Sequence, residues 1–387
     1  MLNFVETEKE ERSFEERIIG AMTEINVIGD DFSGDGWNYI TTEIQEHQNV
    51  LIGEDHFIAE IPDFVASLCD IVTFNNFYIE LDPYSTQLIK TSFSLTEEER
   101  DQFNKKYQDL FSFYALKQEY QLLEKLVQGG VNLLGADQII MTADSFLCQD
   151  LLKITGNEKA VRIYRRIIEQ SRLRFTEFLQ SKDFGNLYFM TPEFENDLEE
   201  LKNITLSSRE HEIINAFDKS VKIYQQQNHN DRVRLLLNQV MKDYDTWKSS
   251  KNLFKYGANH LCRGESFLYV HDIGNLIATL SQANYSSSYH LMIVGMSGET
   301  GTPFRGFPPN VIDTEQGFYL NYLQQFFKVI REHRTEERWY VFNLRSIRLD
   351  LIRGNYQVDN INLERLIKGY DTLVIIPEVT PAEFPEM

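Results

Sequence analysis

Short apolar runs that alternate with helix-like segments constrain the fold of this chain most. The first run, residues 49–53 (NVLIG), is followed at once by charged residues and a helical pattern. The pattern repeats at residues 77–81 (FYIEL) and, after another helical segment, at residues 131–135 (VNLLG). Runs of this length that are rich in β-branched and aromatic residues are typical of buried strands. The alternation therefore predicts a mostly parallel sheet with helices on its faces.

The middle of the chain breaks this alternation. Residues 144–248 show only helical patterning, and strand patterning resumes at residues 252–256, 289–295, 338–342 and 372–376. We therefore predict an α/β fold with a mostly parallel central sheet flanked by helices and a helical insertion over the carboxyl edge of the strands. Residues 1–143 would form the first part of the α/β core, residues 144–248 the helical insertion or lid, and residues 249–387 the second part of the core.

The net charge and the cysteines limit which classes of partner and which cellular compartment we expect. The chain has 38 Lys+Arg against 59 Asp+Glu, a formal net charge of −21, which repels phosphate backbones and anionic lipid surfaces. We expect neither a nucleic-acid partner nor a membrane partner. No apolar run approaches the roughly 18 residues of a membrane span, and the amino-terminal segment is acidic, so we expect a cytoplasmic protein. Cys69, Cys148 and Cys262 are widely spaced and odd in number, which indicates buried thiols and no disulfide framework.

A dense group of ionisable residues follows the first predicted strand. Gly53-Glu54-Asp55-His56 places two carboxylates and an imidazole where a strand gives way to a helix. A glycine there permits close approach of a substrate, and a histidine beside carboxylates can act as a general base or a metal ligand near neutral pH. On the alternative interpretation, Asp55 caps the helix and His56 is a solvated residue of its first turn.

A second Gly-x-x-His follows another predicted strand. Gly257-Ala258-Asn259-His260 comes directly after residues 252–256. Carboxyl ends of parallel strands meet at one edge of a sheet, so His56 and His260 are predicted to share a site there.

Two carboxylates have the same strand-end placement. Glu80 lies in an otherwise apolar run, where an unpaired carboxylate is costly, so it either forms a buried ion pair or points off the strand into a pocket. Asp137 follows the third run and serves either this site or the cap of a helix.

Three basic residues could bind an anionic substrate group or stabilise an oxyanion at this acidic site. They are Lys255, Arg263 and Arg209, and for each the alternative is a surface charge or a structural ion pair. We expect the helical insertion to cover the carboxyl edge of the sheet as a lid with Arg209 as its polar contact, or else to pack against one sheet face.

The order of these motifs resembles the erythromycin-esterase-like and ChaN-like superfamily, to which TraB-type and Tiki-type proteins are related. The matching segments are LIGEDH at 51–56, YIELD at 78–82, LLGADQ at 133–138, SSRE at 207–210, FKYGANHLCRG at 254–264 and HDIGNL at 271–276. The resemblance implies an α/β fold with a strand-end cleft in which Glu54, His56, Glu80 and His260 work together. Erythromycin esterases have one more residue between the Glu and the His of the first motif, and a Gly after that His, whereas Phe57 stands here.

Two classes of function follow from these residues. The first is a hydrolase, in which His56 activates a water against an ester or amide bond, Glu54 or Glu80 orients the imidazole, and His260 stabilises the transition state or acts as the acid. Its substrate would be a small molecule or a peptide. The second is a metal- or haem-binding protein, or a metal-dependent peptidase like those of the Tiki and TraB branch, with the same residues as ligands. The cofactor, a divalent metal or none, stays open.

Overall fold

The computed structural model describes residues 12–107, 111–312, 320–333 and 338–385. In these residues the main sheet has nine strands in the order β2-β1-β10-β11-β7-β3-β6-β4-β5. The strand bounds are β1 (Met22–Ile28), β2 (Asp31–Ser33), β3 (Asn49–Glu54), β4 (Asn76–Ile79), β5 (Asn132–Gly135), β6 (Asn252–Gly257), β7 (Ser288–Gly295), β10 (Arg338–Asn343) and β11 (Thr372–Ile376). The strands β8 (Gly298–Thr300) and β9 (Asn310–Ile312) form a separate pair.

The helices connect and cover these strands. The first group comprises α1 (Phe14–Ala21), α2 (Asp35–Glu46), α3 (Glu60–Ile71), α4 (Pro83–Ser92), α5 (Glu97–Tyr107) and α6 (Lys117–Gln128). The central group comprises α7 (Asp144–Ile154), α8 (Glu158–Ser181), α9 (Pro192–Lys202), α10 (Ser208–Gln226), α11 (His229–Lys242) and α12 (Tyr244–Trp247). The last group comprises α13 (Ile273–Ala283), α14 (Gln324–His333), α15 (Leu344–Ile352) and α16 (Ile361–Gly369). The 3-10 helices are η2 (Ser112–Ala115), η3 (Phe184–Asn186), η4 (Tyr188–Met190), η5 (Ala258–His260) and η6 (Asn321–Leu323).

The run of strands from β11 to β5 is parallel throughout, whereas β2, β1 and β10 join it in antiparallel pairs. The expected α/β class with a mostly parallel central sheet flanked by helices is therefore confirmed. The expected strand over residues 77–81 is shorter, because β4 ends at Ile79 and Glu80 follows it. The sequence pattern did not predict β1, β2, β8 or β9.

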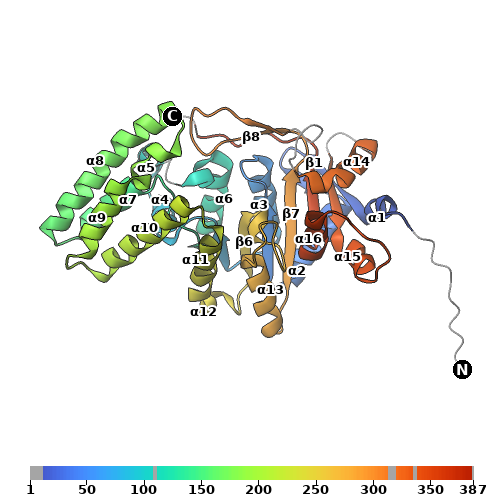
Figure 1. Cartoon of the computed structure of the whole chain (residues 1–387). Coiled ribbons are helices and arrows are strands. Elements are labelled where there is room, and N and C mark those ends of the chain that lie inside the picture. The colour runs from blue at the N-terminus through green and yellow to red at the C-terminus, as the bar shows by residue number, and fades with distance from the viewer. Residues whose placement is uncertain (1–11, 108–110, 313–319, 334–337, 386–387) are drawn as a thin grey trace, which may run out of the picture.

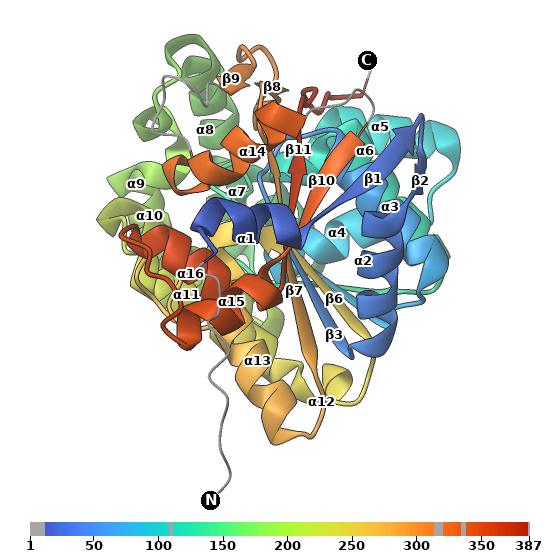
Figure 2. The same cartoon turned by 90° about the vertical axis from the view of Figure 1, so that its right-hand side faces the viewer.

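Side chains alternate across the sheet and build two apolar cores. Val50 and Ile52 belong to the core that includes residues of α2, α3 and α6, and Leu51 belongs to the core that includes residues of α1, α13 and α16. Figure 2 shows the sheet between these two layers of helices. The parallel register pairs Glu54 with Gly257, so the carboxyl ends of β3 and β6 lie level.

The central helices α7 to α12 gather on one side of the molecule, and the chain from β8 crosses above the sheet towards them (Figure 1). A small aromatic cluster fixes this crossing, since Phe304 between β8 and β9 packs with Phe178 of α8 and with Leu187. The later segment therefore crosses above the sheet, and the central helices lie beside it. In the described residues, no helix combines the length and the apolar character that crossing a bilayer requires.

Candidate active site

The site begins at the end of β3. The Glu54 carboxylate lies 2.9 Å from His56 Nδ1 through Oε1 and 2.6 Å from Lys255 Nζ through Oε2. Gly53 precedes it because a Cβ there would lie 2.6 Å from the Tyr370 hydroxyl, closer than packing permits. The glycine thus lets β3 run close to its neighbours and fixes the position of Glu54.

Glu80 lies between two histidines. Directly after β4, its Oε2 lies 3.4 Å from His56 Nε2 and its Oε1 lies 3.5 Å from His260 Nε2. The Gly257 N–H donates to Oε2 at 2.7 Å, and Arg232 donates to Oε1 at 2.7 Å. One buried carboxylate therefore holds both imidazoles, and the two Gly-x-x-His motifs meet on it.

A further carboxylate completes the chain of contacts. His260 lies in η5, and its Nδ1 lies 2.8 Å from Asp272 Oδ2, at the N-cap of α13. Glu54, His56, Glu80, His260 and Asp272 thus form a continuous line of alternating acids and imidazoles, which we call the Glu80 cluster. The His56 side chain is 26% exposed, against 5% for His260, so His56 is the more accessible of the two imidazoles.

The carboxylates set the charge of both histidines. Burial opposes protonation of His56, but Glu80 and Glu54 outweigh it and raise its pKa to about 10. Burial likewise opposes the charge of His260, and Glu80 with Asp272 raises its pKa to about 9. The two imidazoliums in turn overcome the burial of Glu80 and hold its pKa well below the ordinary value. At neutral pH the resting cluster therefore contains two imidazoliums.

Gly257 is required by the same packing. A Cβ at this position would lie 2.9 Å from His56 Nε2 and 3.5 Å from Glu80 Oε2. On its other side His56 stacks on the Phe113 ring, with the ring centroids 4.3 Å apart. The imidazole is thus held in place by packing as well as by its two carboxylates.

Lys255 is buried against Glu54 of the cluster and is not available to a substrate. Its side chain is fully buried, and the ammonium lies 2.6 Å from both Glu54 and Glu119. Burial raises the pKa of Glu119 to about 7, although Lys255 opposes this. The predicted substrate contact is replaced here by a structural one, because both carboxylates already surround the ammonium.

Asp137 joins the site through a residue that the sequence did not single out. Arg232 of α11 contacts Asp137 with Nε at 2.9 Å and with Nη2 at 2.6 Å, and the same Nη2 reaches Glu80. The ring of His229, one turn earlier in α11, lies 5.8 Å from that of His260. Burial, and then His260, lower the pKa of His229, whose Nε2 is buried without a hydrogen-bond partner among the described residues.

The structure does not bring Arg209 or Arg263 to the cluster. Arg209 at the start of α10 stacks 4.8 Å from the Tyr84 ring centroid and lies 3.6 Å from Glu212, beside a separate cavity of about 460 Å³. Arg263 binds Asp371 and the Ser288 carbonyl, which lie at the amino ends of β11 and β7. Arg263 therefore lies at the opposite edge of the sheet, and the polar contact that we expected from Arg209 is made by Arg232.

The described residues do not present a ligand set for a resident metal ion. In the described part of the chain, no group of three or more His, Cys, Asp or Glu side chains is arranged to hold a metal ion. Both ring nitrogens of His56 and of His260 already contact carboxylates, whereas a metal ligand must offer a free lone pair.

Comparisons with known proteins show which solved structures share this fold. No protein-family model matches the sequence, and no curated protein matches it. Among solved structures, a succinoglycan biosynthesis protein has a TM-score of 0.55 at 12% identity, covering 96% of this chain and 98% of that one. An open conformation of a mutant of the erythromycin esterase EreC has a TM-score of 0.55 at 10% identity, covering 94% and 100%. A Bacillus cereus protein has a TM-score of 0.52 at 10% identity, covering 94% and 97%.

These likenesses extend over nearly the whole of each chain. The predicted resemblance to the erythromycin-esterase-like group is therefore confirmed at the level of the fold.

Proposed function

We propose that this chain is a hydrolase that uses the Glu80 cluster to cleave an ester or amide bond of a small molecule or peptide with water. The observation that supports this most is one buried carboxylate shared by two imidazoles, each of which has a second carboxylate behind it. Among the described residues, no serine or cysteine side chain hydrogen-bonds to either imidazole, which favours water as the nucleophile.

The reaction needs one base and one acid. His56, the more accessible imidazole, takes a proton from the attacking water after losing its own, and Glu54 and Glu80 stabilise the imidazolium that forms. The water oxygen bonds to the acyl carbon as the carbonyl oxygen becomes negative. His260 acts in its protonated form, which Glu80 and Asp272 favour by raising its pKa, and it stabilises that oxyanion or protonates the leaving group.

Activity should depend on pH in a direction that follows from these charges. Only neutral His56 can accept a proton and only protonated His260 can act as the acid, and their pKa values are about 10 and about 9, so kcat/KM should rise with pH to a maximum between about 9 and 10 and fall above it. A rise completed below pH 6.5 would instead assign the base to His229, whose pKa is lowered from 6.5.

The proposal is tested by turnover of a panel of esters, amides and peptides. On the best substrate, His56→Gln and Glu80→Gln should each lower kcat by about 10² to 10⁴, the usual contribution of general acid–base groups. His211→Gln, which changes a histidine of α10 outside the cluster, is the matched control and should keep full activity. Full activity of His56→Gln, or no turnover of any member of the panel by the unaltered protein, would contradict a hydrolase built on this cluster.

A further inference from the structure

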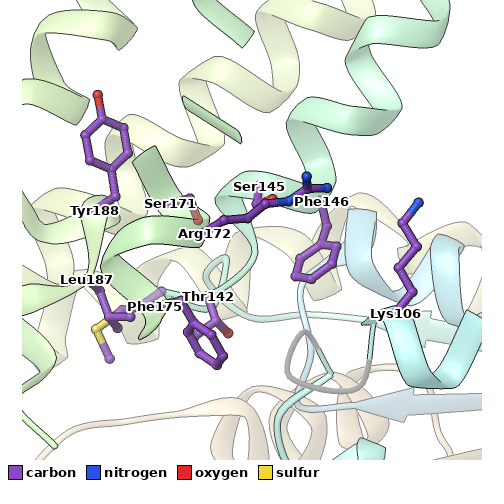
Figure 3. A pocket seen from close by; sticks show the side chains of 10 residues that line it. Lys106, Thr142, Ser145, Phe146, Ser171, Arg172, Phe175, Leu187 and Tyr188 are labelled. Carbon is purple, nitrogen blue, oxygen red and sulfur yellow. The ribbon is translucent and has the colours of Figure 1, made fainter. Parts of the chain in front are cut away.

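A second cavity lies among the central helices, and none of its lining residues belongs to the Glu80 cluster. It has a volume of about 290 Å³ and opens between α5, the start of α7, α8 and the segment that leads into η4 (Figure 3). Its walls combine apolar side chains, serine hydroxyls and two basic residues. Cavities of this kind, mostly apolar with a few polar groups, are typical of small-molecule sites.

The apolar wall is rigid at one end. Phe175 of α8 and Leu187 lie at this end in Figure 3, and both pack in the cluster that Phe304 closes from the β8–β9 segment. Leu187 is only 3% exposed and packs within this cluster. Phe146 of α7 and Met141 extend the apolar surface. This end suits a hydrocarbon or aromatic body and offers it no charged partner.

The basic residues lie at the other end. Figure 3 shows the guanidinium of Arg172 and the ammonium of Lys106 on the side of the cavity away from Leu187. Neither makes an ion pair with a described residue, which is also true of Arg165 on the same helix α8, and Lys106 lies 4.7 Å from the Tyr107 ring centroid. In a chain with 59 acidic against 38 basic residues, two cations left without an acidic partner at one cavity favour an anionic ligand group.

The hydroxyls near these cations support the same ligand. The Ser145 hydroxyl accepts from Gln149 at 3.4 Å, so its own hydrogen can be donated to an anion. Ser171 donates to Asp144 at 2.7 Å, and burial raises the pKa of Asp144 to about 7, so this carboxyl is partly neutral at physiological pH. Asp144 therefore repels an anion only weakly, and Asp197, which accepts from the lining residue Tyr188 at 2.8 Å, is paired with Arg166.

We propose that this cavity binds an amphipathic monocarboxylate, with the carboxylate between Arg172 and Lys106 and the apolar body against Phe146, Phe175 and Leu187. A planar guanidinium can hold a carboxylate through two parallel hydrogen bonds, and Lys106 adds a second charge. The aromatic and aliphatic wall removes the body of the ligand from water. This site does not depend on the hydrolase proposal, because its residues take no part in the Glu80 cluster.

Calorimetric titration with decanoate, below its micelle concentration, tests the proposal directly. Decanoate should saturate one site per chain, decanol should bind at least tenfold more weakly for want of the charge, and acetate should not bind for want of the body. The double variant Arg172→Gln/Lys106→Gln should weaken decanoate at least tenfold. Arg165→Gln, which changes an exposed arginine of α8 outside the cavity, is the matched control and should leave the affinity unchanged.

A second variant separates loss of the cavity from loss of charge. Met141→Trp fills the apolar end and keeps both cations, so it should abolish decanoate binding while the thermal transition stays cooperative. Equal affinity for decanoate and decanol, or unchanged binding in the double variant, would overturn the proposed anion site. Unchanged binding in Met141→Trp would place the ligand elsewhere. Because binding is measured without turnover, each of these results is independent of whether the chain proves to be a hydrolase.

Discussion

Glu80 gives the two histidines different roles although their surroundings are alike. Each imidazole contacts Glu80 with one nitrogen and another carboxylate with the other. When His56 loses its proton, the whole charge of Glu80 acts on His260 and keeps it an acid. The difference in exposure then decides the assignment, since water reaches His56 more readily. A base and an acid can thus arise from one shared carboxylate.

Lys255 provides a test at the level of a single residue. Lys255→Met keeps the length of the side chain but removes the charge that separates Glu54 from Glu119. We expect a loss of about 3–5 kcal/mol in the free energy of unfolding, the usual cost of breaking a buried pair, measured by urea denaturation. Adding Glu119→Gln should restore part of it, because one of the two facing carboxylates becomes neutral.

The matched control for this change is an ion pair at the surface. Lys125 and Asp70 lie 2.7 Å apart with 44% and 63% of their side chains exposed, so Lys125→Met should cost less than about 1 kcal/mol. Equal losses in the two variants would show that Lys255 is not a buried counter-ion of the cluster.

At the level of elements, the sequence predicted the parallel strands of the sheet well and its edges poorly. Buried runs such as residues 50–53 and 373–376 are apolar, and the structure has strands there. The strand β1 was missed because most of its residues are partly exposed and polar residues interrupt the pattern. The positions of Glu54, His56, Glu80 and His260 at strand ends predicted that they lie together, since the carboxyl ends of parallel strands share one edge of the sheet.

The contribution of α11 could not be predicted in the same way. Asp231, Arg232 and Arg234 all look like solvated charges in a helix, and only the docking of α11 selects one of them. The structure turns Arg232 inwards, with 23% of its side chain exposed, and leaves Arg234 at 79%. Nothing in the local pattern carries that information, because it depends on how a distant helix packs at the sheet edge.

The docking of α11 therefore predicts different effects for two neighbouring arginines. Arg232→Leu removes charge-assisted hydrogen bonds to Glu80 and Asp137. The bond to Glu80, worth about 1.5–3 kcal/mol, holds the carboxylate that both imidazoles share, so kcat/KM should fall by about 10- to 100-fold. Arg232→Lys should restore only part of the activity, because an ammonium cannot reproduce the fork that reaches both carboxylates. Arg234→Leu on the same helix should have no effect, and a similar loss in both variants would contradict the role given to Arg232.

Across the whole molecule, buried ionisable groups bias stability towards mildly acidic pH. His56 and His260 have pKa values of about 10 and about 9 in the folded chain, above the ordinary 6.5. Their contribution is full below pH 6.5 and is lost as the pH rises through 9 and 10. Burial raises the pKa of Asp55 and Asp144 to about 7 from 3.8, so charging them also lowers stability as the pH rises towards 7.

At low pH the buried carboxylates lower the stability in their turn. Lys255 and His56 lower the pKa of Glu54 against its burial, and His260 and His56 do the same for Glu80. The stability that Glu54 and Glu80 contribute is present above their ordinary pKa of 4.5. It is lost as the pH falls below that value. The net charge of −21 at pH 7 adds self-repulsion on the alkaline side. Together these contributions predict that the free energy of unfolding is greatest at about pH 5.

Thermal unfolding followed by calorimetry between pH 4 and 10 checks this expectation. The Tm should be highest near pH 5 and should fall towards pH 10, with the steepest loss between about pH 6.5 and 9, where the folded chain keeps protons that the unfolded chain has released. In the double variant His56→Gln/His260→Gln the fall above about pH 6.5 should flatten, because neutral amides replace the groups whose pKa differs between the folded and unfolded chain, while the change below pH 6.5 should persist. A Tm that stays constant or rises between pH 6 and 10 in the unaltered chain would show that the Glu80 cluster does not hold its histidines protonated.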